Sequence, residues 1–221
     1  MTDFTQEGNT STKTSIASSN FFARANCVEI KKDLEFFLLK SQNAKDPVIS
    51  KRYARSAIVF TAFYFESLAN LLLKRLREKY GCHDAFEDYL TIECDWAHPL
   101  LIFLAVYIFV YNKKFVTKKR DDIMPIDISP IKDLFVIRNQ VLAHPRAQSI
   151  VSGTGVESGK GLKEDGKPLS LKKFIHLPNI YLEFTYDHAK EIYDATSQFI
   201  KDYRDLLANN PTDPTLSGLF S

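Results

Sequence analysis

Residues 56–76, SAIVFTAFYFESLANLLLKRL, contain the periodicity that decides the fold class. Apolar side chains recur there every three or four residues, the spacing that places them on one face of an α-helix. We expect this helix to extend from about Ser50 to Tyr80, with Gly81 as its C-cap. Its apolar stripe comprises Ile58, Ala62, Phe65, Ala69, Leu72, Leu73 and Leu76.

The same periodicity predicts helices on both sides of this segment. One is expected from about Asn20 to Ser41, where Asp46-Pro47 ends the pattern, and a short one around Ala85 to Leu90. The last amphipathic helix begins near Asp187, which we expect to act as its N-cap. The sequence therefore predicts an all-α protein, a helical bundle of about five helices.

The segment from Pro99 to Phe115 is apolar or aromatic at nearly every position. Its length, together with Pro99 at a first-turn position, favours a helix over a strand. Its longest apolar run, 99–111, is shorter than the roughly 20 residues of a membrane-spanning helix, so we expect no membrane contact. A helix that is apolar on all sides lies at the centre of a fold or against a second subunit. This pattern favours a homodimer.

Composition shifts divide the chain into one domain and two tails. Residues 1–19 are rich in small polar residues and are expected to form a disordered tail. The helical domain comprises residues 20–208, and residues 209–221 form a second loose tail. The stretch 150–173 contains five of the eight glycines, which predicts a long mobile loop before the last helix. Residues 174–184 are expected to be extended.

The cysteine content and the net charge limit which cellular compartment and which partners can be expected. The three cysteines form no CxxC pair, and residues 1–20 lack the pattern of a signal peptide, so we expect a reduced, cytoplasmic protein. A net charge of +2 gives no large field for nucleic acid, so RNA contact would depend on local basic residues. The candidates are Lys113, Lys114, Lys118, Lys119, Arg120 and Arg146.

A charged residue interrupts the apolar face of the helix that we expect to open with Ser129 as N-cap and Pro130 at its first position. Arg138 lies three or four residues from Leu134, Phe135, Val141 and Leu142 and therefore shares their face. A guanidinium on such a face needs a carboxylate or phosphate partner. Glu66 is the expected partner, because Glu66 and Asn70 interrupt the stripe of the earlier helix in the same way.

His144 follows six residues after Arg138 and should end this helix, since Pro145 disfavours helical geometry in the residue before it. A helix C-terminus favours the protonated imidazole. An arginine that stabilises phosphorane charge and a histidine that transfers protons are suited to RNA cleavage. This chemistry needs no metal or other cofactor.

The segment Arg138-Asn139-Gln140-Val141-Leu142-Ala143-His144 resembles the hallmark of the HEPN superfamily, in which an Arg and a polar residue precede a His by four to six intervening positions. The helix starting Tyr53-Ala54-Arg55-Ser56-Ala57 and the last helix also look like elements of that fold. The resemblance covers about residues 20–207, and only 131–146 is specific. It implies a metal-independent endoribonuclease, and its setting would be a toxin or antiviral defence system.

The same resemblance assigns roles and partners. Arg138 and His144 would be catalytic, Asn139 would orient the histidine or contact phosphate, and two subunits would share a composite groove. RNA would be the substrate, and an antitoxin or another defence protein would be a partner. In HEPN toxins paired with nucleotidyltransferase antitoxins, a tyrosine often stands two residues after the histidine. This chain has Arg146 there, which departs from that pairing.

Two other interpretations remain open at this point. Arg138 could hold Glu66 and Asn70 in a polar core network, and His144 could cap its helix, which would make the domain an inert scaffold. The set Cys82, His83, Cys94 and His98 could bind zinc, but adjacent ligands suit one tetrahedral ion poorly and short CxxC spacing is missing.

Overall fold

The computed structural model describes residues 10–80, 99–111, 124–142, 171–174, 176–177 and 181–210. In this part of the chain five α-helices occur and no strand, which confirms the prediction of an all-α bundle. The helices are α1 (Thr10–Asn43), α2 (Pro47–Tyr80), α4 (Pro99–Val110), α5 (Ser129–Ile137) and α6 (Tyr186–Ala208). A π-helix, η2 (Arg138–Leu142), continues α5, and a short 3-10 helix, η4 (Tyr181–Glu183), precedes α6.

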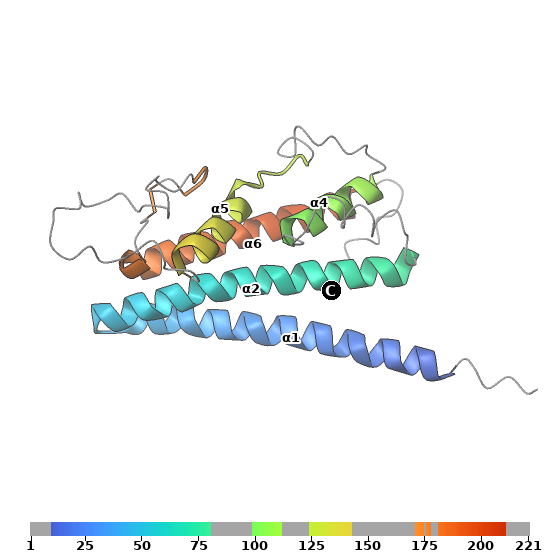
Figure 1. Cartoon of the computed structure of the whole chain (residues 1–221), viewed down its shortest axis with the longest axis horizontal. Coiled ribbons are helices and arrows are strands. Elements are labelled where there is room, and N and C mark those ends of the chain that lie inside the picture. Colours follow the sequence, from blue (N-terminus) through green and yellow to red (C-terminus); the bar gives the residue numbers. More distant parts are fainter. Residues whose placement is uncertain are drawn as a thin grey trace, which may run out of the picture.

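Helices α1 and α2 form a long antiparallel hairpin (Figure 1). The turn depends on Asp46, whose carboxylate accepts the Val48 N–H at 2.7 Å while its carbonyl accepts the Ser50 N–H. This N-cap and a proline in the first turn let α2 begin at Pro47, three residues before the predicted start. The break at Asp46-Pro47 is confirmed.

The prediction of a disordered segment over residues 1–19 is wrong from Thr10 onward, because α1 begins there. Extending a formed helix by one residue adds a backbone hydrogen bond and needs no new nucleation. Polar composition therefore did not set the boundary. Residues 1–9 lie outside the described part of the chain.

Helix α2 is the central element, with α1 along one side and α4, α5 and α6 along the other (Figure 1). Its buried face includes Ala54, Ile58, Ala62, Phe65 and Leu72. This is the face that the apolar stripe predicts. Helix α5 runs in the opposite direction to α2, which brings the predicted motif helix against it (Figure 1).

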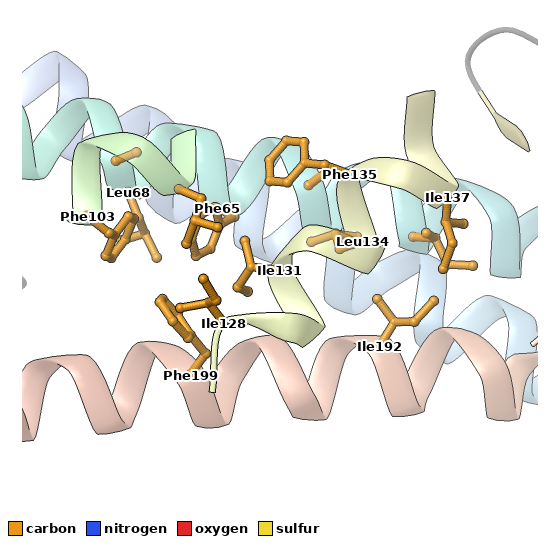
Figure 2. Close-up of a cluster of buried hydrophobic side chains, with 14 of the residues drawn as sticks. Phe65, Leu68, Phe103, Ile128, Ile131, Leu134, Phe135, Ile137, Ile192 and Phe199 are labelled. Atoms are coloured by element: carbon orange, nitrogen blue, oxygen red, sulfur yellow. The ribbon is translucent and has the colours of Figure 1, made fainter. Parts of the chain in front are cut away.

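Aromatic rings from α2, α4, α5 and α6 pack together at the centre of the bundle (Figure 2). Phe65 of α2 stacks on Phe103 of α4 with centroids 4.7 Å apart, and lies 5.7 Å from Phe199 of α6 and 6.0 Å from Phe135 of α5. The Tyr203 hydroxyl donates to the Phe103 carbonyl at 2.8 Å. Such offset and edge-on ring pairs add to the stabilisation from apolar burial. The motif helix is thereby fixed to the core.

Helix α4 confirms the choice of helix over strand for the apolar segment. Seven of its twelve residues are buried within this chain, while Phe109 remains 37% exposed. Its apolar composition is therefore largely explained by a central position in the bundle. By length and composition alone, α2 is apolar enough to cross a membrane over Pro47–Lys79. Half of that apolar window is buried inside the bundle, and a single helix of this kind is weak evidence for a membrane span.

The N-terminus of α5 differs from the prediction in detail. The N-cap is Ile128, not Ser129, while Pro130 is in the first turn as expected. The Asp127 carboxylate accepts the Ser129 N–H at 2.9 Å, so an acidic side chain one residue earlier satisfies the first amide. Asp127 and Ser129 are both residue types that commonly cap helices, and here the Asp127 carboxylate is the acceptor for the first amide.

The chain before α6 also departs from the prediction. An extended segment over 174–184 is contradicted at Tyr181–Glu183, which is a 3-10 turn. The α6 N-cap is Thr185, not Asp187, and the Thr185 N–H donates to His188 Nδ1 at 3.2 Å. After α6, Asn210 is buried and donates to the Val110 carbonyl at 3.4 Å, so the start of the predicted tail packs on α4. The helix predicted at Ala85–Leu90, residues 150–170 and residues 211–221 lie outside the described part.

Candidate functional site

Arg138 stands where α5 ends and η2 begins. Its Nη2 donates to the Glu66 carboxylate at 2.7 Å, which confirms the predicted partnership between the two interrupted stripes. Its Nη1 donates to Asn139 Oδ1 at 2.7 Å. The guanidinium also lies 5.6 Å from the Phe63 ring centroid and 5.7 Å from that of Phe135, within the range of cation–π attraction. The side chain is held on several sides yet stays 21% exposed.

Glu66 is a carboxylate in a partly dry position, with 29% of its side chain exposed. Burial raises the pKa of Glu66 above its ordinary value, while the Arg138 guanidinium acts in the opposite direction. The contact is a single hydrogen bond to one carboxylate oxygen, not a bidentate pair. The guanidinium therefore keeps donor capacity beyond Glu66 and Asn139.

Asn70 does not join this network as predicted, because its side chain is exposed. A step of four residues exceeds one helical turn of about 3.6 residues, so each such step moves further around the helix. Glu66 is already at the edge of the buried face, and Asn70 lies beyond that edge. The expected polar cluster is reduced to Arg138, Glu66 and Asn139.

Of the predicted site residues that remain, the structure describes Asn139 alone. His144, the basic candidates Lys113, Lys114, Lys118, Lys119, Arg120 and Arg146, and the zinc candidates Cys82, His83, Cys94 and His98 lie outside the described residues. Asn139 is described and exposed, and its oxygen accepts from Arg138. Within the described residues, no group of three His, Cys, Asp or Glu side chains is arranged to hold a metal ion.

The helix widens at the first residue of the motif. We expected one continuous α-helix to His144, but Arg138–Leu142 is a π-helix. Short π segments are uncommon and often occur at functional sites, because the extra residue redirects the following side chains. Val141 and Leu142 remain buried on the core side, while Asn139 is exposed. The sequence contains no signal for this change of winding.

Asp133 is a buried acid that the sequence reasoning did not single out. It is 2% exposed, and its carboxylate accepts the backbone N–H groups of Lys172, Lys173 and Phe174 at 2.5–3.0 Å. Consecutive amides directed at one anion make a favourable binding geometry. Asp133 thus attaches residues 172–174 to the middle of α5. The sequence does contain a sign of this buried acid, because Asp133 stands directly before Leu134 in an otherwise apolar helical segment.

A groove of about 590 Å³ lies beside the end of η2. We call it the arginine groove. Its polar residues are Arg52, Arg55 and Ser56 of α2, and its apolar residues are Val59, Phe60, Leu142 and Leu182. Arg55 is 8% exposed, whereas Arg52 is open to solvent. The groove therefore combines a fixed guanidinium, a solvent-exposed guanidinium and an apolar wall.

A second groove, of about 320 Å³, lies between α1, α2 and α6. It includes Lys31, Tyr64, Tyr193, Lys201 and Arg204. Burial raises the pKa of Tyr64 to about 12, so this phenol stays neutral at physiological pH. The groove is also basic, but α1, α2 and α6 alone form it, without residues of the motif helix.

Comparison of the chain with protein-family models, with curated proteins and with solved structures finds no match. The class that the fold itself defines is therefore an all-α helical bundle with a partly exposed Arg–Glu pair beside a basic groove.

Proposed function

We propose that the protein is a metal-independent endoribonuclease of the HEPN type, acting in the cytoplasm as part of a toxin or defence system. The observation that carries the proposal is Arg138, whose guanidinium is held by Glu66, Asn139 and two aromatic rings yet remains 21% exposed. A fixed guanidinium with donors left over is suited to bind phosphate oxygens. His144 follows it at the spacing of the HEPN motif.

The proposed reaction is an intramolecular transfer at phosphorus. The 2′-hydroxyl of one nucleotide loses its proton and forms a bond to phosphorus, while the bond to the 5′-oxygen of the next nucleotide breaks and that oxygen gains a proton. His144 transfers these protons, and Arg138 stabilises the charge on the phosphorane oxygens. The products are a 2′,3′-cyclic phosphate and a 5′-hydroxyl.

The active form in this proposal is a homodimer with one composite RNA site. Helix α4 gives less support than its composition suggested, because most of it is buried within the chain. The dimer therefore depends on the HEPN resemblance. Light scattering at micromolar concentration should show a two-subunit mass, and a monomer would weaken the composite site. An antitoxin or another defence protein is the proposed regulatory partner.

A second candidate function is an inert HEPN-like scaffold. The observation in its favour is that Arg138 already has two short hydrogen bonds, to Glu66 and Asn139, within its own chain. Hydrogen bonds of this kind are consistent with a purely structural role for Arg138, in which it binds no ligand. The two candidates differ in what His144 does, so they are separable by an assay of that residue.

The decisive experiment is RNA cleavage by the purified protein with chelator present. We expect slow cleavage that leaves 2′,3′-cyclic phosphate ends, and His144→Ala should reduce the rate by roughly 10²–10⁴-fold. His176→Ala is the matched control, because His176 is an exposed histidine paired with Glu191 at 2.9 Å, and it should cleave as the wild type does. Equal cleavage by folded His144→Ala would reject the site. Absence of cleavage by the wild type would favour the scaffold.

Arg138 provides an independent test of the same site. Arg138→Ala should lower the cleavage rate by a comparable factor, because transition-state charge would lose its donor. The melting temperature must be measured beside activity, since Glu66 would lose its cation. Arg138→Lys keeps the positive charge but loses the planar fork, so partial activity is expected. Full activity of folded Arg138→Ala would contradict the proposed role.

A further inference from the structure

Three cations line the second groove, which lies between α1, α2 and α6. Lys31 comes from α1, and Lys201 and Arg204 come from α6. The Glu35 carboxylate is 3.7 Å from Lys31 Nζ, and the Asp205 carboxylate is 3.9 Å from Arg204 Nε. Both distances exceed the roughly 2.7–2.9 Å of a charge-assisted hydrogen bond. Lys201 makes no ion pair with any residue that the structure describes, so the positive charge of the groove is only partly compensated.

The side of α6 that faces the groove consists of hydrogen-bond donors. Tyr193, Ser197, Lys201 and Arg204 follow one another at intervals of three or four residues, which places them on one face of the helix. Tyr193 and Ser197 are partly buried, and their hydroxyls make no hydrogen bond within the described part of the chain. The neighbouring Thr196 hydroxyl, in contrast, donates to a backbone carbonyl at 2.8 Å. A hydroxyl without a protein partner can donate to a ligand.

Tyr64 adds a donor from α2, on the other side of the groove. Burial raises the pKa of Tyr64 to about 12, and the Tyr193 phenol and the Glu35 carboxylate act in the same direction. The Tyr64 phenol therefore keeps its proton at physiological pH. A carboxylate that opposes ionisation of Tyr64 also opposes a bound anion beside it. The favourable place for an anion is consequently the α6 side of the groove, near Lys201 and Arg204.

The groove also has an apolar part and a limited size. Leu68 and Ile200 belong to its lining, and Leu68 is buried. Its volume of about 320 Å³ is at the lower end of the range of ligand pockets, roughly 300–1,000 Å³. Positive charge, free hydroxyl donors and an apolar surface in this volume suit a small anion that carries an organic group.

We propose that the second groove binds a small phosphate monoester, whose phosphate oxygens accept from Ser197, Lys201 and Arg204 while Tyr64 donates from the opposite side. The organic group of the ligand lies on Leu68. A phosphate monoester has a charge of about −1.5 to −2 at pH 7 and three strong acceptor oxygens. A carboxylate has a single charge and two oxygens in one plane. The inference goes beyond the proposed endoribonuclease and does not depend on it, because the groove contains no residue of the motif helix.

The test is a chemical-shift titration of the full chain by NMR, with phenyl phosphate as the probe. The amide resonances of Ser197 and Lys201 should shift and saturate with a dissociation constant on the order of 1 mM, at the weak end of the affinity scale. Inorganic phosphate should bind roughly tenfold more weakly, because it lacks the apolar contact. If these resonances do not shift with phenyl phosphate, the site is rejected. If inorganic phosphate binds as tightly, the assignment to a monoester is rejected.

Two substitutions test the proposed contacts. Lys201→Ala should weaken the binding of phenyl phosphate by about tenfold, and Tyr64→Phe, which keeps the ring, by roughly fivefold. Lys45→Ala is the matched control, because it removes an exposed lysine between α1 and α2, outside the groove, and it should bind as the wild type does. The melting temperatures should hardly change, since neither Lys201 nor the Tyr64 hydroxyl has a partner among the described residues. Equal losses for Lys201→Ala and Lys45→Ala, or no loss for folded Lys201→Ala, would overturn the proposal.

The pH dependence distinguishes a phosphate from a carboxylate. Phenyl phosphate loses its second proton at about pH 6, so its affinity should rise as the pH increases from 5 to 7. Benzoate should bind more weakly and without this rise, because a carboxyl group with a pKa of about 4 is already ionised. The described lining contains no histidine, and Tyr64 does not titrate in this range. A flat profile for phenyl phosphate, or tighter binding of benzoate, would reject the phosphate monoester as the ligand class.

Discussion

Asp133 and Arg138 interrupt the apolar character of the same helix five positions apart, yet they meet opposite environments. Asp133 is 2% exposed, and three consecutive backbone amides surround its carboxylate. Arg138 is 21% exposed, and it shares its donors between one carboxylate oxygen and one amide oxygen. One charge is enclosed by the fold, and the other is held at its surface.

The difference separates a structural charge from a candidate functional one. A buried carboxylate is stable only when hydrogen-bond donors replace the lost water, and Asp133 has such donors. A partly exposed guanidinium can still exchange water for a ligand without breaking the core. We therefore expect Asp133 to control folding and Arg138 to control activity.

The largest effect on folding should come from Asp133→Ala. The substitution removes charge-assisted hydrogen bonds and leaves the Phe174 amide buried without its acceptor. Its cost should be about 3 kcal/mol in the free energy of unfolding, measured by urea denaturation. Hydrogen exchange at the Phe174 amide should also become faster.

Asp194→Ala is the control for that experiment, because Asp194 is exposed and pairs with Lys190 one turn away on α6. Pairs of this kind contribute about 0.3–0.5 kcal/mol. If both substitutions cost the same, Asp133 is not the anchor of residues 171–174, and the contrast with Arg138 disappears.

A smaller effect is expected for the Arg138–Glu66 pair. A double-mutant cycle with Arg138→Ala and Glu66→Ala should give a coupling energy of about 1 kcal/mol or less, because both side chains are partly solvated. A coupling of several kcal/mol would show that the pair serves mainly the fold. That outcome would favour the inert scaffold over the endoribonuclease.

Asn139→Ala should change the free energy of unfolding less than Asp133→Ala or the loss of the Arg138–Glu66 pair does. Asn139 is exposed, and its oxygen restrains the Arg138 fork at 2.7 Å. Surface substitutions usually stay within about 0.5 kcal/mol, so the melting temperature should hardly move. The cleavage rate should fall nonetheless if the restraint keeps Arg138 ready for phosphate. An unchanged rate would show that Glu66 and the rings suffice.

The Arg138–Glu66 contact could be predicted from sequence because each residue interrupts an apolar stripe and their charges are opposite. The same reasoning could not find the partners of Asp133, since they are backbone amides 39–41 residues further along. Every residue type except proline provides such a donor, so composition carries no trace of these partners. Asn70 shows the converse error, because spacing alone placed it on the buried side.

The helices followed from periodicity, whereas their ends did not. Capping depends on which of several neighbouring polar side chains reaches the first free amides, as Asp127 does in place of Ser129. The π-helix at Arg138–Leu142 packs against α2, and local sequence does not encode such a contact between distant segments. The arginine groove could not be predicted from the sequence, because its residues come from three separate elements.

The smallest expected effect is a pH dependence at Glu66, and its sign follows from the cause of the shift. Burial raises the pKa of Glu66, and Arg138 only partly opposes this. A raised pKa means that the folded protein binds the proton more tightly than the unfolded chain does. The stabilisation from this group is therefore complete below the unfolded pKa and is lost as pH rises through the folded pKa.

Glu66→Gln removes this titration while keeping an oxygen that can accept from Arg138. The stability of the wild type relative to Glu66→Gln should consequently decrease as pH rises from about 4, near the ordinary glutamate pKa. Urea denaturation of both proteins at matched pH values measures this difference. A difference that instead grows with rising pH would mean that Arg138 outweighs burial at Glu66. The pair would then be a strong ion pair that serves the fold, and Arg138 would resemble Asp133 more than a residue held ready for a ligand.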